Sequence, residues 1–255
     1  MSVLDAFSLK DKVAVITGAS KGIGEAIARA YAEAGARVVI SSRKQDAVDA
    51  AAADLRARGL DAVGIAAHVG QMEDLDRLVQ QTLDTYGGID ILVNNAAINP
   101  VFGPILDTDE AVFDKIMQVN LKGPFELGKR VHPIMKERGG GSVINISSIG
   151  GISPEPGLGI YSVSKAALIS LTKVMAKEWG DDRIRVNAIC PGLIKTKFST
   201  ALWQNEKIKN RVLAQQPIKR IGLPEDVVGL ALFLASEASA YCTGAVYMVD
   251  GGHVI

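Results

Sequence analysis

Three residues in this sequence could together deliver a proton to a bound molecule. Tyr161 and Lys165 stand four positions apart in Y-S-V-S-K, and Ser148 lies thirteen residues before the tyrosine in N-I-S-S-I. If residues 159–180 are helical, Tyr161 and Lys165 project from one face. An ammonium beside a phenol stabilises the phenolate and lowers a pKa that starts at about 10. Ser148 must then arrive from the end of a separate strand, where its hydroxyl would hold a carbonyl oxygen that accepts the Tyr161 proton. Taken alone, a Tyr/Lys pair at this spacing is more often a solvated pair on an amphipathic helix.

A glycine-rich turn near the N-terminus predicts a nucleotide site. Residues 13–16 form a short β-branched run, which is typical of a strand buried on both faces. Gly18, Gly22 and Gly24 follow, and the apolar stripe after them predicts a helix over 22–34. The turn therefore joins a strand to a helix N-terminus, where free N–H groups and the helix dipole attract phosphate. We expect glycine at these positions because a side chain would block the close approach of a pyrophosphate.

Strand-like and helical patterns alternate along residues 1–255 without a linker, which predicts a single α/β domain with a doubly wound parallel sheet. The expected strands are 13–16, 38–41, 62–65, 91–93, 142–146, 185–189 and 246–249, and the expected helices are 22–34, 44–58, 73–86, 109–136, 159–180 and 225–235. Pro124 falls inside the 109–136 pattern, so we expect that helix to bend or restart there. Ligands of such sheets collect beyond the C-terminal ends of the strands.

Composition argues against several classes of function. The formal net charge is zero, so no basic surface indicates nucleic acid or an anionic membrane as a partner. The N-terminal segment lacks the basic region of a secretory signal, and no apolar run reaches the ~20 residues of a membrane span. Cys190 and Cys242 are isolated, so neither a disulfide framework nor a metal site is expected. We therefore expect a cytoplasmic protein.

Together these motifs resemble the short-chain dehydrogenase/reductase family over nearly the whole chain. T-G-A-S-K-G-I-G (17–24) is similar to its cofactor turn, N-N-A-A (94–97) to the segment after its fourth strand, and P-G-L-I-K-T (191–196) to the loop that borders the nicotinamide. Ser148, Tyr161 and Lys165 match the catalytic serine, tyrosine and lysine in order and spacing, and Asn120 in V-N-L matches the active-site asparagine. The resemblance implies a seven-stranded Rossmann sheet of order 3-2-1-4-5-6-7.

The resemblance also implies a mechanism and a set of cofactor contacts. The nicotinamide would deliver hydride to a carbonyl carbon while Tyr161 gives a proton to the oxygen that Ser148 polarises. Lys165 would lower the Tyr161 pKa and bind the nicotinamide ribose, and Asn120 would hold a water that links Lys165 to solvent. The expected cofactor-binding residues are Gly18, Ser20, Lys21, Gly22, Ile23, Gly24, Ser42, Arg43, His68, Val69, Asn94, Ala96, Tyr161, Lys165, Pro191, Gly192, Ile194 and Thr196.

The end of the second strand favours NADP(H) over NAD(H). NAD-dependent members of the family carry an acidic residue there, whereas this chain has Ser42 followed by Arg43. A guanidinium can form bidentate charge-assisted bonds to a 2′-phosphate, and Lys21 adds a second positive charge. Ordinary helix-flanking charge is the alternative for Arg43. After the third strand, His68 replaces the family's aspartate, which contacts the adenine amino group. We expect either a ring nitrogen of His68 or the backbone at Val69 to accept that bond.

Residues 193–222 break the alternation of strands and helices. The family covers its substrate with this segment, so we expect a lid, with a surface helix pair packed on the core as the alternative. The expected substrate pocket is formed by Ser148, Ile149, Phe198, Leu202 and Trp203. This apolar wall predicts reduction of apolar or aromatic ketones and aldehydes. The chain is most similar to the NADP-dependent carbonyl and retinal reductase branch. A 3-oxoacyl carrier-protein reductase is the alternative, and a non-catalytic NADP(H)-binding sensor or structural protein is an alternative of another class.

The helix expected at 159–180 is apolar or small around much of its circumference. The sheet explains one buried face, and the remainder requires another partner. Because the family pairs this helix and the one at 109–136 with symmetry mates, the resemblance implies a homotetramer.

Overall fold

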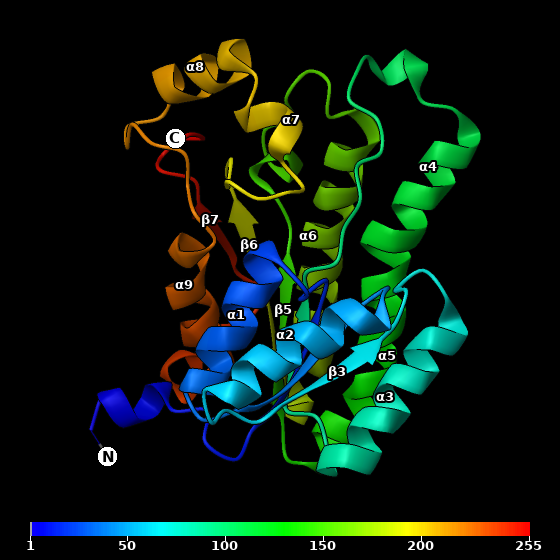
Figure 1. The fold of residues 1–255 in the computed structure, drawn as a ribbon, viewed down its shortest axis with the longest axis vertical. Coiled ribbons are helices and arrows are strands. Elements are labelled where there is room, and N and C mark those ends of the chain that lie inside the picture. The colour runs from blue at the N-terminus through cyan, green and yellow to red at the C-terminus, as the bar shows by residue number, and fades with distance from the viewer. Residues whose placement is uncertain (1) are drawn as a thin grey trace.

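The computed structural model describes residues 2–255 and contains a parallel sheet with helices on both faces (Figure 1). Its seven strands are β1 (Val13–Thr17), β2 (Arg37–Ser42), β3 (Ala62–Ala66), β4 (Ile91–Asn94), β5 (Gly141–Ile146), β6 (Ile184–Pro191) and β7 (Val246–Val249). Their order is β3-β2-β1-β4-β5-β6-β7, with every neighbouring pair parallel. The predicted fold class and strand order are confirmed. The order reverses between β1 and β4, which is where such sheets bind ligands.

The helices form two layers, one on each face of the sheet. Helices α1 (Gly22–Glu33), α2 (Gln45–Ala57) and α9 (Glu225–Ala235) share one buried core, and α3 (Met72–Tyr86), α5 (Gly123–Glu137) and α6 (Gly159–Trp179) share the other. Successive strand residues point to opposite faces, so Ala14 and Ile16 join the first core while Val15 joins the second. This double burial is the physical reason that the strands are continuous apolar runs.

The helix expected over 109–136 is interrupted, as Pro124 predicts. Helix α4 (Glu110–Met117) ends in a single π-helical turn over Gln118–Lys122, and α5 begins at Gly123 with the proline in its first turn. Proline is tolerated there because the first N–H groups of a helix have no intrahelical partner. The π-helical turn buries Asn120 completely. Such turns are frequent at functional sites.

Residues 193–222 form an excursion whose two ends meet. The N–H of Lys195 donates to the carbonyl of Gly222 at 2.8 Å, and the N–H of Gly222 donates to the carbonyl of Leu193 at 3.1 Å. Between these ends, α7 (Thr200–Trp203) and α8 (Glu206–Gln215) lie beyond the C-terminal ends of the strands (Figure 1). Neither helix contains a buried residue. The excursion therefore occupies the place that the lid prediction requires.

Within residues 2–255, no helix combines the length and the apolar character that crossing a membrane requires.

Candidate active site

Ser148, Tyr161 and Lys165 meet beyond the C-terminal end of β5. Ser148 follows that strand by two residues, and the tyrosine and lysine lie on the first two turns of α6. Lys165 is 2% exposed, and its Nζ donates to the Ile146 carbonyl at 2.7 Å and lies 5.7 Å from the Tyr161 ring centroid. The Ser147 hydroxyl donates to the Lys165 carbonyl at 2.8 Å. Two hydrogen bonds therefore hold the start of α6 against the end of β5.

The electrostatics of this cluster differ from the expectation that Lys165 lowers the Tyr161 pKa. Burial raises the pKa of Tyr161 to about 12, and the hydrogen-bonding interaction with the Ser148 side chain opposes that rise. Burial also lowers the pKa of Lys165 to about 8. A buried ammonium requires an acceptor, and here it takes the Ile146 carbonyl rather than the phenol oxygen. Ser148, rather than Lys165, is therefore the neighbour that favours the phenolate in this arrangement.

Asn120 connects the catalytic helix to the segment after β4. Its Oδ1 accepts from the Ile98 N–H at 2.8 Å, and its Nδ2 donates to the Ile98 carbonyl at 2.9 Å and to the Ser164 hydroxyl at 3.1 Å. Ser164 in turn donates to the Tyr161 carbonyl at 2.7 Å. The Asn120 side chain is thus a brace for the turn that carries Tyr161, and its water-holding role stays a prediction.

Two glycines of the glycine-rich turn are in close contact with the segment that follows β4. A Cβ at Gly18 would lie 2.9 Å from Ala96 Cα, and one at Gly24 would lie 2.5 Å from Asn95 Nδ2. Packing of the segment after β4 on the turn therefore requires these two glycines, and the argument from pyrophosphate clearance stays a prediction. Gly18 and Gly22 both have a positive φ, of +65° and +67°, but the nearest neighbour of a Cβ added at Gly22 is the Thr196 methyl group, at 3.4 Å. Only Gly22 therefore faces the loop after β6.

Asn95 is a site residue that the sequence reasoning missed. Its Nδ2 donates to the carbonyls of Thr17 at 2.9 Å and Gly18 at 3.1 Å, which clamps the glycine-rich turn. The predicted neighbour Asn94 instead points into the sheet, where its Nδ2 donates to Asn145 Oδ1 at 2.9 Å. Adjacent residues at a strand end face opposite directions, and that alternation is the only local signal that separates the two asparagines.

Seven more expected cofactor residues lie around the glycine-rich turn and in the segment at the end of β6. Around the turn, Lys21 is exposed, Ser20 is partly exposed and Ile23 packs against the core. After β6, the Gly192 N–H donates to the Val249 carbonyl at 3.0 Å, and Ile194 is 5% exposed within the core. Pro191 ends β6, so Thr196 is the member of that motif that reaches the glycine-rich turn.

The ends of β2 and β3 present the residues expected near the adenosine. Ser42 ends β2, and Arg43 is exposed directly after it. His68 Nδ1 accepts from the Gly70 N–H at 3.1 Å, so in the neutral ring the proton sits on Nε2. With Nδ1 engaged in this way, Nε2 is the ring nitrogen left for a ligand. The adenine contact, through the His68 ring or through the backbone at Val69, stays a prediction.

Of the residues expected to form the substrate wall, Phe198 lies beside Tyr161 and Trp203 is hydrogen-bonded to the loop after β6. The rings of Phe198 and Tyr161 are 6.1 Å apart between centroids, and Phe198 is 56% exposed. Trp203 Nε1 donates to the Thr196 carbonyl at 3.0 Å, so this indole also anchors the loop after β6. Leu202, next to Trp203 in the sequence, and Ile149, next to Ser148, are both partly buried.

The segment after β4, which the sequence reasoning did not single out, packs on the loop before α6. The Phe102 ring lies 2.8 Å from a Cβ added at Gly157, and the Gly103 N–H donates to the Gly157 carbonyl at 3.1 Å. Gly157 belongs to the loop that leads into α6. No period in the sequence marks Phe102, because the contact joins segments that are far apart in the chain.

Within residues 2–255, no group of three or more His, Cys, Asp or Glu side chains is arranged to hold a metal ion.

Comparisons with known proteins extend over nearly the whole chain. A protein-family model described as Enoyl-(Acyl carrier protein) reductase matches residues 18–253. The rabbit (Oryctolagus cuniculus) protein dehydrogenase/reductase SDR family member 4 is 50% identical over 244 residues, which cover 96% of this chain and 94% of the relative. A gluconate 5-dehydrogenase from Burkholderia cenocepacia, solved in complex with NADP and tartrate, has a TM-score of 0.95 and 33% identity over 99% of this chain and 98% of that one. A 7α-hydroxysteroid dehydrogenase complexed with NADH and 7-oxo glycochenodeoxycholic acid has a TM-score of 0.94 and 34% identity over 99% and 98%.

The pKa assignment predicts a specific outcome in an ultraviolet difference titration of the protein without added nucleotide. The difference between the wild type and Tyr161→Phe should show the phenol ionising only near pH 12, because burial disfavours the phenolate. Ser148→Ala should move that ionisation still higher, since it removes the opposing hydrogen bond. Lys165→Met should move it much less. A Tyr161 phenolate near neutral pH that disappears in Lys165→Met would contradict this assignment.

Proposed function

The chain belongs to the short-chain dehydrogenase/reductase family, and from that premise we propose that it reduces apolar or aromatic ketones and aldehydes with NADPH. The observation that carries the proposal is the convergence of the Ser148 and Tyr161 side chains beside the exposed Phe198 ring. A carbonyl oxygen placed between the two hydroxyls would meet both a hydrogen-bond donor and a proton donor. The apolar ring would bury the rest of the molecule.

The α1 N-terminus suits a phosphate group. No side chain caps this helix, so its first N–H groups have no side-chain partner at the glycine-rich turn. Gly22 adopts a positive φ that favours glycine, so no side chain obstructs the turn at this position. Lys21, which is exposed, is the preceding residue. Backbone donors and a positive charge together form the environment that an anionic pyrophosphate requires.

In the proposed mechanism, the nicotinamide cofactor supplies the hydride when bound. Ser148 donates a hydrogen bond to the substrate oxygen and orients it, and Tyr161 transfers its phenolic proton to the same oxygen. The Lys165 ammonium, buried and hydrogen-bonded to the Ile146 carbonyl, would bind the nicotinamide ribose. Asn120 acts through Ser164 to keep the first turn of α6 in place.

NADP(H) is the proposed cofactor because of the residues after β2, not because of the fold. One similar structure is described as a complex with NADP and another as a complex with NADH, so the shared architecture is compatible with either nucleotide. Here the strand ends in Ser42 without a carboxylate, and the exposed guanidinium of Arg43 follows. A guanidinium favours a 2′-phosphate by charge-assisted hydrogen bonds.

A carrier-protein thioester is the second candidate substrate, because the matched family model is described as Enoyl-(Acyl carrier protein) reductase. Such a partner is acidic and would require free basic residues at the entrance of the site. Two of the basic residues on the excursion are already engaged: Lys195 Nζ lies 5.1 Å from the Trp203 ring centroid, and Lys209 Nζ lies 3.0 Å from Glu206. Glu155 is paired with Arg211 at 3.1 Å.

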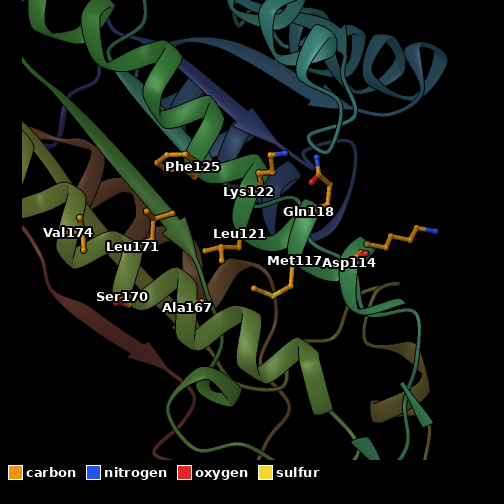
Figure 2. A pocket seen from close by; sticks show the side chains of 11 residues that line it. Asp114, Met117, Gln118, Leu121, Lys122, Phe125, Ala167, Ser170, Leu171 and Val174 are labelled. Atoms are coloured by element: carbon orange, nitrogen blue, oxygen red, sulfur yellow. The ribbon is translucent and has the colours of Figure 1, made fainter. Parts of the chain in front are cut away.

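The proposed assembly is a homotetramer, and a groove on the outer face of α6 supports it. The groove has a volume of about 830 Å³ and runs between α6 and the α4–α5 segment (Figure 2). Its lining is mainly apolar, with Phe125 39% exposed and Val174 47% exposed. Exposed apolar surface of this kind is typical of a contact between subunits. A second copy of the chain is the occupant we propose.

The reaction is tested by activity measurements with NADPH and a panel of ketones, aldehydes and 3-oxoacyl thioesters. We expect turnover of apolar and aromatic carbonyl compounds, and we expect Tyr161→Phe to lower kcat by about 10²- to 10⁴-fold, the usual contribution of a general acid. NADPH binding should stay nearly unchanged, because the ring still packs. Tight NADPH binding with no turnover of any carbonyl compound would instead support a non-catalytic sensor.

The cofactor assignment is tested by Ser42→Asp combined with Arg43→Leu. The double variant should lose roughly 10- to 100-fold of its preference for NADPH over NADH, since it removes charge-assisted bonds and adds a repelling carboxylate. Lys44→Leu is the matched control, because it removes the next exposed charge and should leave the preference unchanged. A wild type that uses NADH better than NADPH would disprove the assignment.

The assembly is tested by multi-angle light scattering. We expect the wild type to be a tetramer at micromolar concentration, and we expect Val174→Glu to give smaller species, because it places a charge in the apolar groove. Thr85→Glu, an exposed position on α3, should leave the mass unchanged. A monomeric wild type would rule out the proposed contact.

A further inference from the structure

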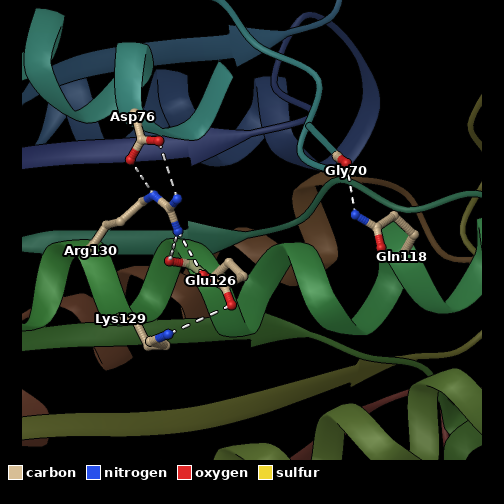
Figure 3. A network of polar contacts seen from close by, with 6 residues as sticks. All are labelled: Gly70, Asp76, Gln118, Glu126, Lys129 and Arg130. Atoms are coloured by element: carbon tan, nitrogen blue, oxygen red, sulfur yellow. Dashed lines mark hydrogen bonds and ion pairs between the residues drawn. The ribbon is translucent and has the colours of Figure 1, made fainter. Parts of the chain in front are cut away.

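The loop that follows β3 is held by residues from two other elements. The His68 N–H donates to Asp74 Oδ2 at 2.7 Å, and Asp74 belongs to the first turn of α3. From the opposite side, Gln118 Nε2 donates to the Gly70 carbonyl at 2.8 Å (Figure 3). Residues 68–70 are therefore fixed between α3 and the π-helical turn.

Packing leaves this loop little freedom. A Cβ at Gly70 would lie 3.0 Å from His68 Cε1 and 3.3 Å from Gln118 Cγ, so the glycine is enclosed between these two side chains. A Cβ at Gly123 would lie 2.6 Å from the Val69 carbonyl oxygen, so the start of α5 touches the same loop. The loop and the π-helical turn thus fit each other closely at backbone level.

The elements on either side of the loop are also tied together. Arg130 of α5 makes two hydrogen bonds to Asp76 of α3, at 2.7 and 3.3 Å, and Glu126 pairs with Arg130 at 2.8 Å (Figure 3). These bonds tie α5 to α3, which carries Asp74, and α5 continues directly from the π-helical turn that carries Gln118. Bidentate guanidinium pairs of this kind have a fixed geometry.

The proposed cofactor would run from the α1 N-terminus, across the end of β2, and on toward the end of β3. The pyrophosphate belongs at the helix N-terminus, and the adenosine ribose belongs at the end of β2. The next strand along that edge is β3, so the base must lie close to residues 68–70. Because Gly70 donates to His68 Nδ1, the position of Gly70 also affects the orientation of that ring.

We propose that Gln118 is a positioning residue for the adenine end of the cofactor, which it affects through its hydrogen bond to Gly70. This inference rests on the proposed NADP(H) function and adds to it a residue that does not touch the nucleotide. Loss of the bond lets residues 68–70 shift and weakens binding of the adenosine half. The chemistry at Tyr161 is unaffected, because Asn120 braces α6 through separate bonds.

Adenosine 2′,5′-bisphosphate tests this directly, because it carries only the adenosine half of NADP and needs no turnover. By calorimetry, Gln118→Met should bind it roughly three- to tenfold more weakly than the wild type, the range expected for one hydrogen bond. Gln118→Lys, which keeps a donor, should bind it more tightly than Gln118→Met. Lys122→Met is the matched control, since Lys122 lies in the same π-helical turn and lines the same groove. It should leave binding unchanged.

Two further measurements separate positioning from general damage. The KM for NADPH should rise in Gln118→Met while kcat stays near the wild-type value, and kcat/KM with reduced nicotinamide mononucleotide, which lacks adenosine, should not change. Because Gln118 also lines the groove, light scattering must show the same mass for the variant and the wild type. A variant that binds the bisphosphate as tightly as the wild type overturns this inference alone. A wild type that binds neither the bisphosphate nor NADPH overturns the proposed cofactor and this inference with it.

Discussion

A single buried charge organises the centre of this protein. The Lys165 ammonium has almost no contact with solvent, and a charged group in that position must have a hydrogen-bond acceptor. The Ile146 carbonyl at the end of β5 provides it, so the second turn of α6 cannot move away from the sheet without stranding the charge. Tyr161, one turn earlier, is thereby placed against Ser148. The proposed proton donor is therefore held by the requirement to pair one ammonium.

Two further braces depend on the same arrangement. The Ser147 hydroxyl, at the end of β5, donates a hydrogen bond to the Lys165 carbonyl. Asn120 holds the first turn of α6 through its hydrogen bond to Ser164. Asn120 reaches that turn only because the helix before α5 opens into a π-helical turn. The π-helical turn thus contacts three parts of the protein. Asn120 connects it to the turn that carries Tyr161, Gln118 connects it to the loop after β3, and several of its residues line the groove beside α6.

Much of this arrangement could be predicted from the sequence, because it depends on local rules. The apolar runs determined the strands and the 3.6-residue stripes determined the helices. Pro124 indicated the irregularity in the helix over 109–136, although Pro133 lies inside α5 without a similar break. The spacing of Tyr161 and Lys165 determined that both project from one helix face. These properties involve residues a few positions apart, so neighbours in the chain are sufficient to specify them.

Only the tertiary structure decided which groups face one another across the sheet edge. It gave Lys165 a strand carbonyl rather than the tyrosine oxygen, chose Asn95 over Asn94 as the clamp of the glycine-rich turn, and placed Phe102 against the loop before α6. It also brought the two ends of residues 193–222 together through backbone hydrogen bonds. Each of these contacts joins segments whose separation in space depends on strand order and on the exact packing of helices. The order of residue types along the chain does not specify how far apart two distant segments lie in space. These contacts can therefore be identified only in the folded structure.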